Sequence, residues 1–427
     1  MAKTNHPEYN LYRSYWNQVR TFAKGMRDVQ DYLQNVTNKT DPQSAIRNRD
    51  YKARAKYTNF TSRTRNALSG AVFRKEPNSE LPSALEFLED NANGAGLTLN
   101  QLAKSLVSNL IEIGRHGLFV DYGISAKIVS YSAENIIDWE TDEAGLLSKV
   151  VLITGKKQEK HLVIDNDGFY AVEYYKDDED KPYEIVTPTK SDGSRFDYIP
   201  FIFCGSVNNS PDVDDMPLWA IVDISQGHYQ NSAEYEDLIR CMPPTIAVTV
   251  PNKSWQEEML PSGYYEVGDG NMIPLPDGGT AILIQASANT MAYEAMKHKE
   301  DQLIMLGARL ISGGGGVETA EAVRIKYSSE NSVLDNLANN ASEAIEKCLY
   351  WCAEFEGIQG DIKYELNREF WDTKLSPQDI SAQILLLNNN VKAMSDVRNT
   401  LRESGELAQD RKDEDIDGEI EIFGSGL

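Results

Sequence analysis

The chain has few of the residues from which metal and redox sites are built. It holds 4 cysteines and 5 histidines among 427 residues. The cysteines show no metal-ligand spacing, and Cys348 and Cys352 stand four residues apart, as on one face of a helix, with Trp351 between them. We therefore expect these cysteines to pack in a core, the protein to stay in a reducing compartment, and no metal or other cofactor to be bound.

Long apolar runs are also missing. No stretch approaches the roughly 18 consecutive apolar residues that a membrane-spanning helix needs. The first ten residues, MAKTNHPEYN, lack the apolar core of a signal peptide. The sequence therefore predicts no membrane partner and a protein that remains in the compartment where it is made.

Positive charge is scarce relative to negative charge. Lys and Arg total 42 against 66 Asp and Glu, which gives a net charge of −24. Proteins that grip nucleic acid carry excess Lys and Arg against the phosphates, so this balance argues against tight binding. It does not exclude a protein that surrounds DNA loosely, because an acidic channel repels phosphates and lets a duplex slide.

Signatures of catalysis are absent as well. Gly313–Gly316 resemble a phosphate-binding loop, but Val317-Glu318-Thr319 put an acid where such a loop needs Lys followed by Ser or Thr. His228 and His298 have no partner set for a nucleophile relay and no HExxH motif. We expect no enzyme and no catalytic residues; the alternative from a different class, a metal-dependent phosphohydrolase, would need a cluster of carboxylates and histidines.

The acidic end of the chain allows two interpretations. Asp413, Asp415, Asp417 and Gly418 match the first half of a calcium loop, but Gly424 stands where the loop needs Glu. The sequence favours a disordered acidic tail over a calcium site.

Two long helices of matched length are the main feature that is present. The first is predicted over 217–241, between Pro217 at its start and Met242-Pro243-Pro244 at its end. The second is predicted over 289–311 and stops at Ser312 and the glycines. The insert between them, 242–288, reads as short strands at 245–250, 264–267, 272–275 and 281–285, with a short helix near 255–259.

This helical hairpin has little apolar surface. One face of the first helix carries Leu218, Ile221, Val222, Tyr229, Leu238 and Ile239, and the other carries Asp223, Gln226, Gln230, Glu234 and Asp237. Packing against neighbouring copies would stabilise it. An ordinary α-hairpin inside a monomeric domain is the alternative.

The remaining segments predict an α+β fold. Helices are expected over 9–35, 45–75, 81–90 and 99–114, and the second of these is strongly basic, which suits either DNA or, preferably, acids of the same chain. Strands at 117–122, 127–131, 150–153, 160–164 and 170–175 predict an antiparallel meander, with Asp165–Gly168 as a turn and Trp139 in the core. After the glycines come a helix over 318–355, kinked near 328–332 with a buried stripe from Ala338 to Cys352, a strand at 362–366, and helices over 377–388 and 396–404.

The order of helix, β insert, helix, glycine loop and helix resembles the portal proteins of tailed double-stranded DNA bacteriophages. Short sequence motifs are similar as well: HYQNSAEYE (228–236), LGARL (306–310), ETAEA (318–322), RNALSGAVFRKEP (65–77), and the segments 59–61, 395–401 and 404–407. The resemblance covers most of the chain, although no single motif is diagnostic.

The resemblance implies a division of the chain into portal parts. It assigns a wing to 1–216 and 319–375, stem helices to 217–241 and 289–311, a clip to 242–288, a tunnel loop to 312–318, a crown to 376–410 and an acidic tail to 411–427. The DNA channel would be lined by the tunnel loop and stem, namely Ser312, Gly313, Gly314, Gly315, Gly316, Val317, Glu318, Lys297 and Lys299. The clip would offer a docking surface of Trp255, Glu257, Glu258, Tyr264 and Tyr265.

The function implied by the resemblance is that of a ring, by family expectation of twelve subunits, at one vertex of a virus capsid. Double-stranded DNA would pass through without sequence specificity during packaging and ejection. Expected partners are the terminase large subunit, an adaptor or head-completion protein, and the major capsid and scaffolding proteins, with assembly in the host cytoplasm. Another head-tail assembly or adaptor protein is the alternative within the same class.

Overall fold

The computed structural model describes residues 5–35, 44–123, 125–155, 158–176, 181–241, 245–249, 278, 280–284, 290–311, 320–368, 370, 377–389, 391–403, 407–408 and 411–424. The chain divides into two compact units, Met1–Leu366 and Asn367–Leu427. None of the described helices is long and apolar enough to span a bilayer.

The helices that open the first unit are shorter than the sequence predicts. The helix expected over 9–35 is α1, Pro7–Lys24, followed by the 3₁₀ turn η1, Val29–Tyr32, because Gly25 takes a left-handed φ of 106°. The basic helix expected over 45–75 is broken into α2, Ser44–Arg54, and α3, Phe60–Val72. The Asn59 side chain causes the break: its oxygen accepts from Ser62 N at 2.8 Å as an N-cap, and its amide donates to Ala23 O at 3.0 Å.

Two antiparallel sheets confirm the α+β class. One has the order β3-β2-β9 and the other the order β4-β5-β6-β7-β8. Their bounds are β2 Arg115–Tyr122, β3 Ala126–Ser132, β4 Ile136–Thr141, β5 Leu147–Thr154, β6 Gln158–Ile164, β7 Tyr170–Lys176, β8 Glu184–Val186 and β9 Phe201–Gly205. The five strands predicted for the meander all fall within these elements, whereas β4, β8 and β9 were not predicted. Gly168 closes the predicted turn by donating its N–H to Asp165 O at 3.0 Å, and Trp139 is buried.

Helices α5 and α9 cover the three-stranded sheet. Thr98 and Gln101 form a capping box at the start of α5, Leu99–Ile113. Helix α9, Ala320–Glu356, runs through 328–332 without interruption, so the kink stays a prediction. Its predicted stripe is buried as expected, from Ala338 to Cys352, and Cys204, Cys348 and Cys352 are buried free thiols. The single helix expected over 81–90 is instead two short elements, the 3₁₀ turn η2, Ser83–Leu85, and α4, Phe87–Asp90. Strand β1, Asn78–Glu80, pairs with β12, Lys363–Glu365.

A buried ion-pair network joins the first helices to α5. Glu112 accepts from both Arg20 and Arg65, and Arg20 Nε also donates to Glu134 at 2.8 Å. Burial acts to raise the pKa of Glu134, but the hydrogen bond and charge of Arg20 outweigh it and bring that pKa below its ordinary value of 4.5. Part of the basic surface predicted at 45–75 therefore meets acids of the same chain, as Arg54 does with Asp237 at 2.9 Å.

The lowered pKa gives this network a pH dependence. A carboxyl whose folded pKa is depressed stabilises the fold above its unfolded pKa, and this contribution is lost as the pH falls through the folded value. We expect Glu134→Gln to lower the urea midpoint at neutral pH, and we expect this difference to shrink as the pH falls below 4.5 and through the folded pKa. A difference that stays constant throughout this acid titration would mean that the ionised carboxylate contributes nothing.

The second unit corrects the prediction of a disordered acidic tail. It contains α10, Pro377–Asn388, α11, Met394–Glu403, and α12, Asp413–Gly424. Asp413 and Asp417 lie one helical turn apart on α12, where Arg402 and Arg398 of α11 bind them. The acidic run is helical because its charges have these cationic partners, and a helix at 413–418 is incompatible with a calcium loop.

Candidate functional site

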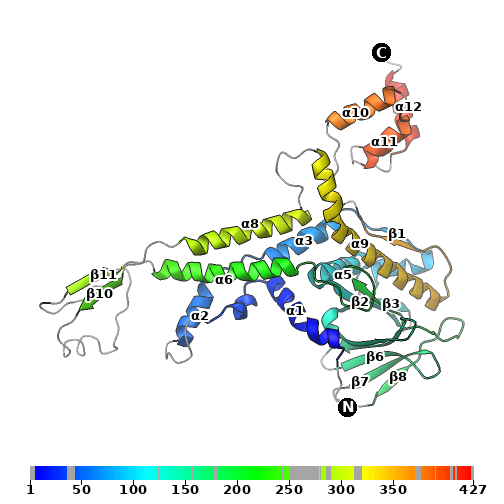
Figure 1. Ribbon diagram of the computed structural model, residues 1–427. Coiled ribbons are helices and arrows are strands. Elements are labelled where there is room, and N and C mark those ends of the chain that lie inside the picture. Colours follow the sequence, from blue (N-terminus) through cyan, green and yellow to red (C-terminus); the bar gives the residue numbers. More distant parts are fainter. Residues whose placement is uncertain are drawn as a thin grey trace. The chain divides into compact units, whose positions relative to one another are not determined.

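The candidate site is the antiparallel pair of long helices, with the segments at its two ends. Helix α6 spans Trp219–Cys241 and α8 spans Met291–Ile311, within two residues of the predicted bounds. At 23 and 21 residues, both are rods of about 30–35 Å. Figure 1 shows them side by side, leading away from the sheets to the strands β10 and β11.

Side-chain contacts fix the register of the two helices. His228 Nε2 lies 3.0 Å from Glu300 Oε1, and the rings of Tyr235 and Tyr293 lie 5.9 Å apart. Seven residues forward along α6 thus correspond to seven residues back along α8, as straight antiparallel rods require. We name this pair the stem hairpin.

A two-stranded ribbon lies at the far end of the stem hairpin. Strand β10, Thr245–Thr249, pairs antiparallel with β11, Thr280–Ile284. These are the first and last strands predicted for the insert. The other predicted elements of the insert, and the docking residues Trp255, Glu257, Glu258, Tyr264 and Tyr265, lie outside the described residues.

The half of α6 nearest the sheets is packed into the body. Leu218, Ile221, Val222, Tyr229 and Ala233 are buried. From α1, Gln18 donates to Gln226, and the ring of Tyr57 meets that of Tyr229 edge-on at 5.6 Å. The backbone N–H of Lys56, just after α2, donates to Ser232 Oγ at 2.9 Å. The stem hairpin is therefore anchored at one end by the core of the first unit.

Large apolar side chains face solvent in both halves of the stem hairpin, with Ile304 and Met305 on α8 near the body and the others toward the far end. Each is more than a third exposed, and Met291 reaches 72%. The set is Leu238, Ile239, Met291, Tyr293, Ile304 and Met305, which we call the stem apolar set. The sequence analysis placed Leu238 and Ile239 on the apolar face of α6, and both are among the exposed residues. Such a series on one projecting element is typical of a surface that another chain covers.

The charged residues predicted to line a channel are described only in part. Lys297 is exposed on α8, whereas Lys299 is half-buried, with its aliphatic stem against Gly227 of α6. A side chain at 227 would require the Lys299 side chain to shift, because an added Cβ would lie 2.8 Å from Lys299 Cε. The tunnel-loop residues Ser312, Gly313, Gly314, Gly315, Gly316, Val317 and Glu318 lie outside the described residues.

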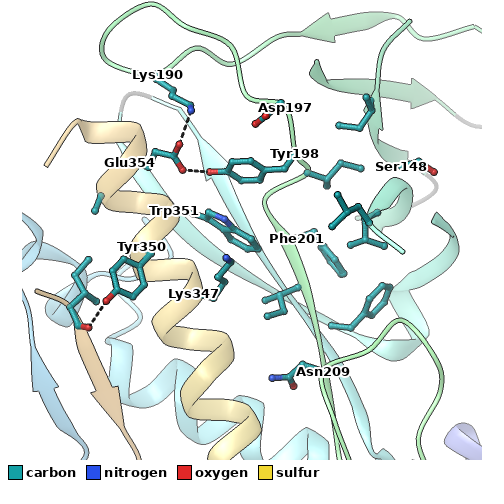
Figure 2. A pocket seen from close by; sticks show the side chains of 18 of the residues that line it. Ser148, Lys190, Asp197, Tyr198, Phe201, Asn209, Lys347, Tyr350, Trp351 and Glu354 are labelled. Atoms are coloured by element: carbon teal, nitrogen blue, oxygen red, sulfur yellow. Dashed lines mark hydrogen bonds and ion pairs between the residues drawn. The ribbon is translucent and has the colours of Figure 1, made fainter. Parts of the chain in front are cut away.

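A second feature, a groove of about 1500 Å³ beside the C-terminal half of α9, was not predicted. Figure 2 shows Lys347, Tyr350, Trp351 and Glu354 of α9 along one side, opposite Tyr198 and Phe201. Lys347 lies over the Trp351 ring at 5.6 Å from its centre. The signal in the sequence was the spacing of Lys347, Trp351 and Glu354, which places them together on the helix face beside the buried cysteines.

The groove contains an ion pair between Lys190 and Glu354, with Tyr198 as a second donor to the carboxylate. Lys190 Nζ lies 2.6 Å from Glu354, and Tyr198 donates to the other carboxylate oxygen (Figure 2). Burial opposes ionisation of Glu354, but these two donors lower its pKa below the ordinary value. The carboxylate thus stays ionised at neutral pH and is not set up to donate a proton. Among the described residues, no group of three or more His, Cys, Asp or Glu is arranged to hold a metal ion.

Comparison with known proteins finds one matching family model and several similar solved structures. A family model described as a domain of unknown function, DUF4055, matches residues 217–356, which run from the start of the stem hairpin to the end of α9. No curated protein matches the sequence.

Among solved structures, a chain from the virion of a native gene transfer agent particle is 11% identical with a TM-score of 0.46, over 90% of this chain and 98% of that one. A chain from the neck of the native particle, computed with C12 symmetry, is 11% identical with a TM-score of 0.45, over 80% and 89%. An HK97-family phage portal protein from Corynebacterium diphtheriae is 11% identical with a TM-score of 0.34, over 72% and 91%. The resemblance to portal proteins seen in the sequence thus recurs among solved structures, at a similarity too low to carry a function across.

Proposed function

We propose that this chain is a portal-type subunit, which assembles with copies of itself into a ring at one vertex of a virus capsid and connects head to tail. The observation that carries the proposal is the stem hairpin: two matched antiparallel rods, anchored at one end, that keep the stem apolar set exposed. The portal-like sequence motifs in the same segment support the proposal.

The exposed apolar residues favour assembly on physical grounds. Six large apolar side chains lose contact with water when equivalent rods line up side by side. Since each is already partly buried, each gains only a part of the roughly 1.5–3 kcal/mol that full burial contributes. Contacts between different faces of identical subunits either close into rings or run on as filaments. Rods that project from one side of a wider body favour closure around an axis parallel to the rods.

In this proposal the ring is a passage for double-stranded DNA and not a tight binder. A net charge of −24 repels phosphates, so the duplex passes without sequence-specific bonds. Lys297, Lys299 and the segment 312–318 are the proposed channel residues, which touch phosphates transiently. Residues 255–265 are the proposed docking surface for an adaptor or head-completion protein, and the terminase large subunit, capsid and scaffolding proteins are the other proposed partners.

Purified protein examined by electron microscopy tests the proposal directly. We expect rings with an open bore at micromolar concentration. Only monomers or dimers under these conditions would contradict it.

The stem apolar set provides a mutational test. We expect Ile304→Ser combined with Met305→Ser to reduce the ring fraction by about tenfold or more, because apolar contacts between rods are lost. The matched control is Ile185→Ser on β8, which is 58% exposed, as Ile304 is, but lies outside the stem hairpin. Rings that survive the double change as well as the control would show that the stem does not hold the subunits together.

A further inference from the structure

Helix α6 is flanked by two other helices on opposite faces. His228 and Tyr235, which contact α8, lie on one face, whereas Asp237, which binds Arg54 at the end of α2, lies half a helical turn away on the other. Figure 1 likewise shows α2 and α8 on opposite sides of α6. The stem region therefore presents two different outer surfaces, one from α2 and one from α8.

The outer surface of α2 is basic. Arg49 is exposed and Lys52 half-exposed on the side of α2 away from the buried Tyr51, Lys56 just after the helix is exposed, and Ile46 is 56% exposed. Its acid, Asp50, forms an exposed ion pair with Arg49 at 3.0 Å. Such surface pairs contribute little and exchange readily for a better partner. The surface thus combines excess positive charge with an apolar side chain.

The outer surface of α8 has the complementary character. Glu294 and Asp301 are exposed at a spacing of two helical turns, and Lys297, at the edge of this face, leaves two carboxylates against one ammonium. Met291 and Met305, both from the stem apolar set, lie on the same face. This surface is therefore acidic and apolar where that of α2 is basic and apolar.

We infer that the α2 surface of one subunit docks on the α8 surface of the next copy of this chain. Opposite charges then meet across the contact, and Ile46 packs near the exposed methionines. Because the two surfaces lie on opposite sides of α6, the contact is head-to-tail, and each subunit uses one surface toward each neighbour. The inference rests on the proposed ring and specifies which surfaces build it.

Charge reversal tests this pairing. One variant carries Arg49→Glu and Lys52→Glu, and the other carries Glu294→Lys and Asp301→Lys. We expect each alone to form about tenfold fewer rings, since like charges then face one another. An equimolar mixture should recover rings, because alternating subunits restore opposite charges at every contact. Glu143→Lys with Asp167→Lys, two exposed acids on loops of the larger sheet, is the control and should assemble normally.

Crosslinking gives a second readout that does not depend on assembly strength. Arg49→Cys with Asp301→Cys, in a background carrying Cys241→Ser, should yield a ladder of covalent oligomers with a short thiol-reactive crosslinker. The remaining native cysteines are buried and should not react. The inference would be overturned if both charge-reversal variants formed rings normally and the double-cysteine variant gave no ladder. The proposed function would then still stand. An unmodified chain that forms no rings would overturn both.

Discussion

Replacing Gly114 by Ala should destabilise the protein by about 2 to 5 kcal/mol. Gly114 ends α5 with a left-handed φ of 69° and leads directly into β2. An added Cβ would lie 2.3 Å from the carbonyl oxygen of Asp215, a separation that real contacts do not tolerate. Both the backbone strain and the displaced segment raise the free energy of the folded state, so urea denaturation should show a clearly lower midpoint.

A matched glycine separates the two causes. Gly96 also has a left-handed φ, 87°, but no atom lies within 4 Å of the position its Cβ would take. Gly96→Ala should therefore cost only the conformational term, about 1 to 2 kcal/mol. If Gly114→Ala proved no more destabilising than Gly96→Ala, the close approach of Asp215 would not matter.

The same close approach sets the direction of the stem hairpin. Ser206 N donates to Gly114 O at 3.0 Å, and Ser206 Oγ donates to Asp215 O at 2.8 Å. Asp214 then accepts from the N–H groups of Val207 and Asn208. The short segment before α6 is thus bonded to the body at several points, so Gly114→Ala should also loosen the base of the stem and lower the yield of rings.

The parts of this fold that the sequence predicted are those determined locally. Pro217 and the Pro243-Pro244 pair bracket α6, and a helical period of small and apolar residues runs through α9 from Ala338 to Cys352. The structure confirms the helix bounds and the buried stripe because proline geometry and apolar periodicity act within a few residues of chain.

The parts that were missed depend on partners distant in sequence. The break at Asn59 is fixed by Ala23, and the helical tail at Asp413–Gly424 by Arg398 and Arg402. Strand β9 was overlooked because its five residues form a strand only beside β2. The candidate site shows the same contrast. The two helices were predictable from local sequence, but the exposure of Leu238 depends on how far the body of the first unit covers α6.

Glu112→Gln should be among the most destabilising changes in the chain, at about 3 to 5 kcal/mol. The Glu112 side chain is almost fully buried and binds Arg20 of α1 and Arg65 of α3 at once. Glutamine has nearly the same shape but no charge, so two partly buried guanidinium groups lose the carboxylate that compensated them. Removing one member of such a network costs more than the pair contributes, because the remaining charges stay in a poorly solvated position.

Glu140→Gln is the matched control for this prediction. Glu140 also binds a cation, with its carboxylate 2.9 Å from Lys149 Nζ, but its side chain is 58% exposed. Water replaces the lost partner there, so the cost should stay below about 1 kcal/mol. Urea denaturation of both variants, followed by circular dichroism, measures the difference. Similar losses in the two would mean that burial of Glu112 adds nothing. A loss confined to Glu112 would show that the packing of α5 with α1 and α3, which themselves contact α6, depends on one carboxylate.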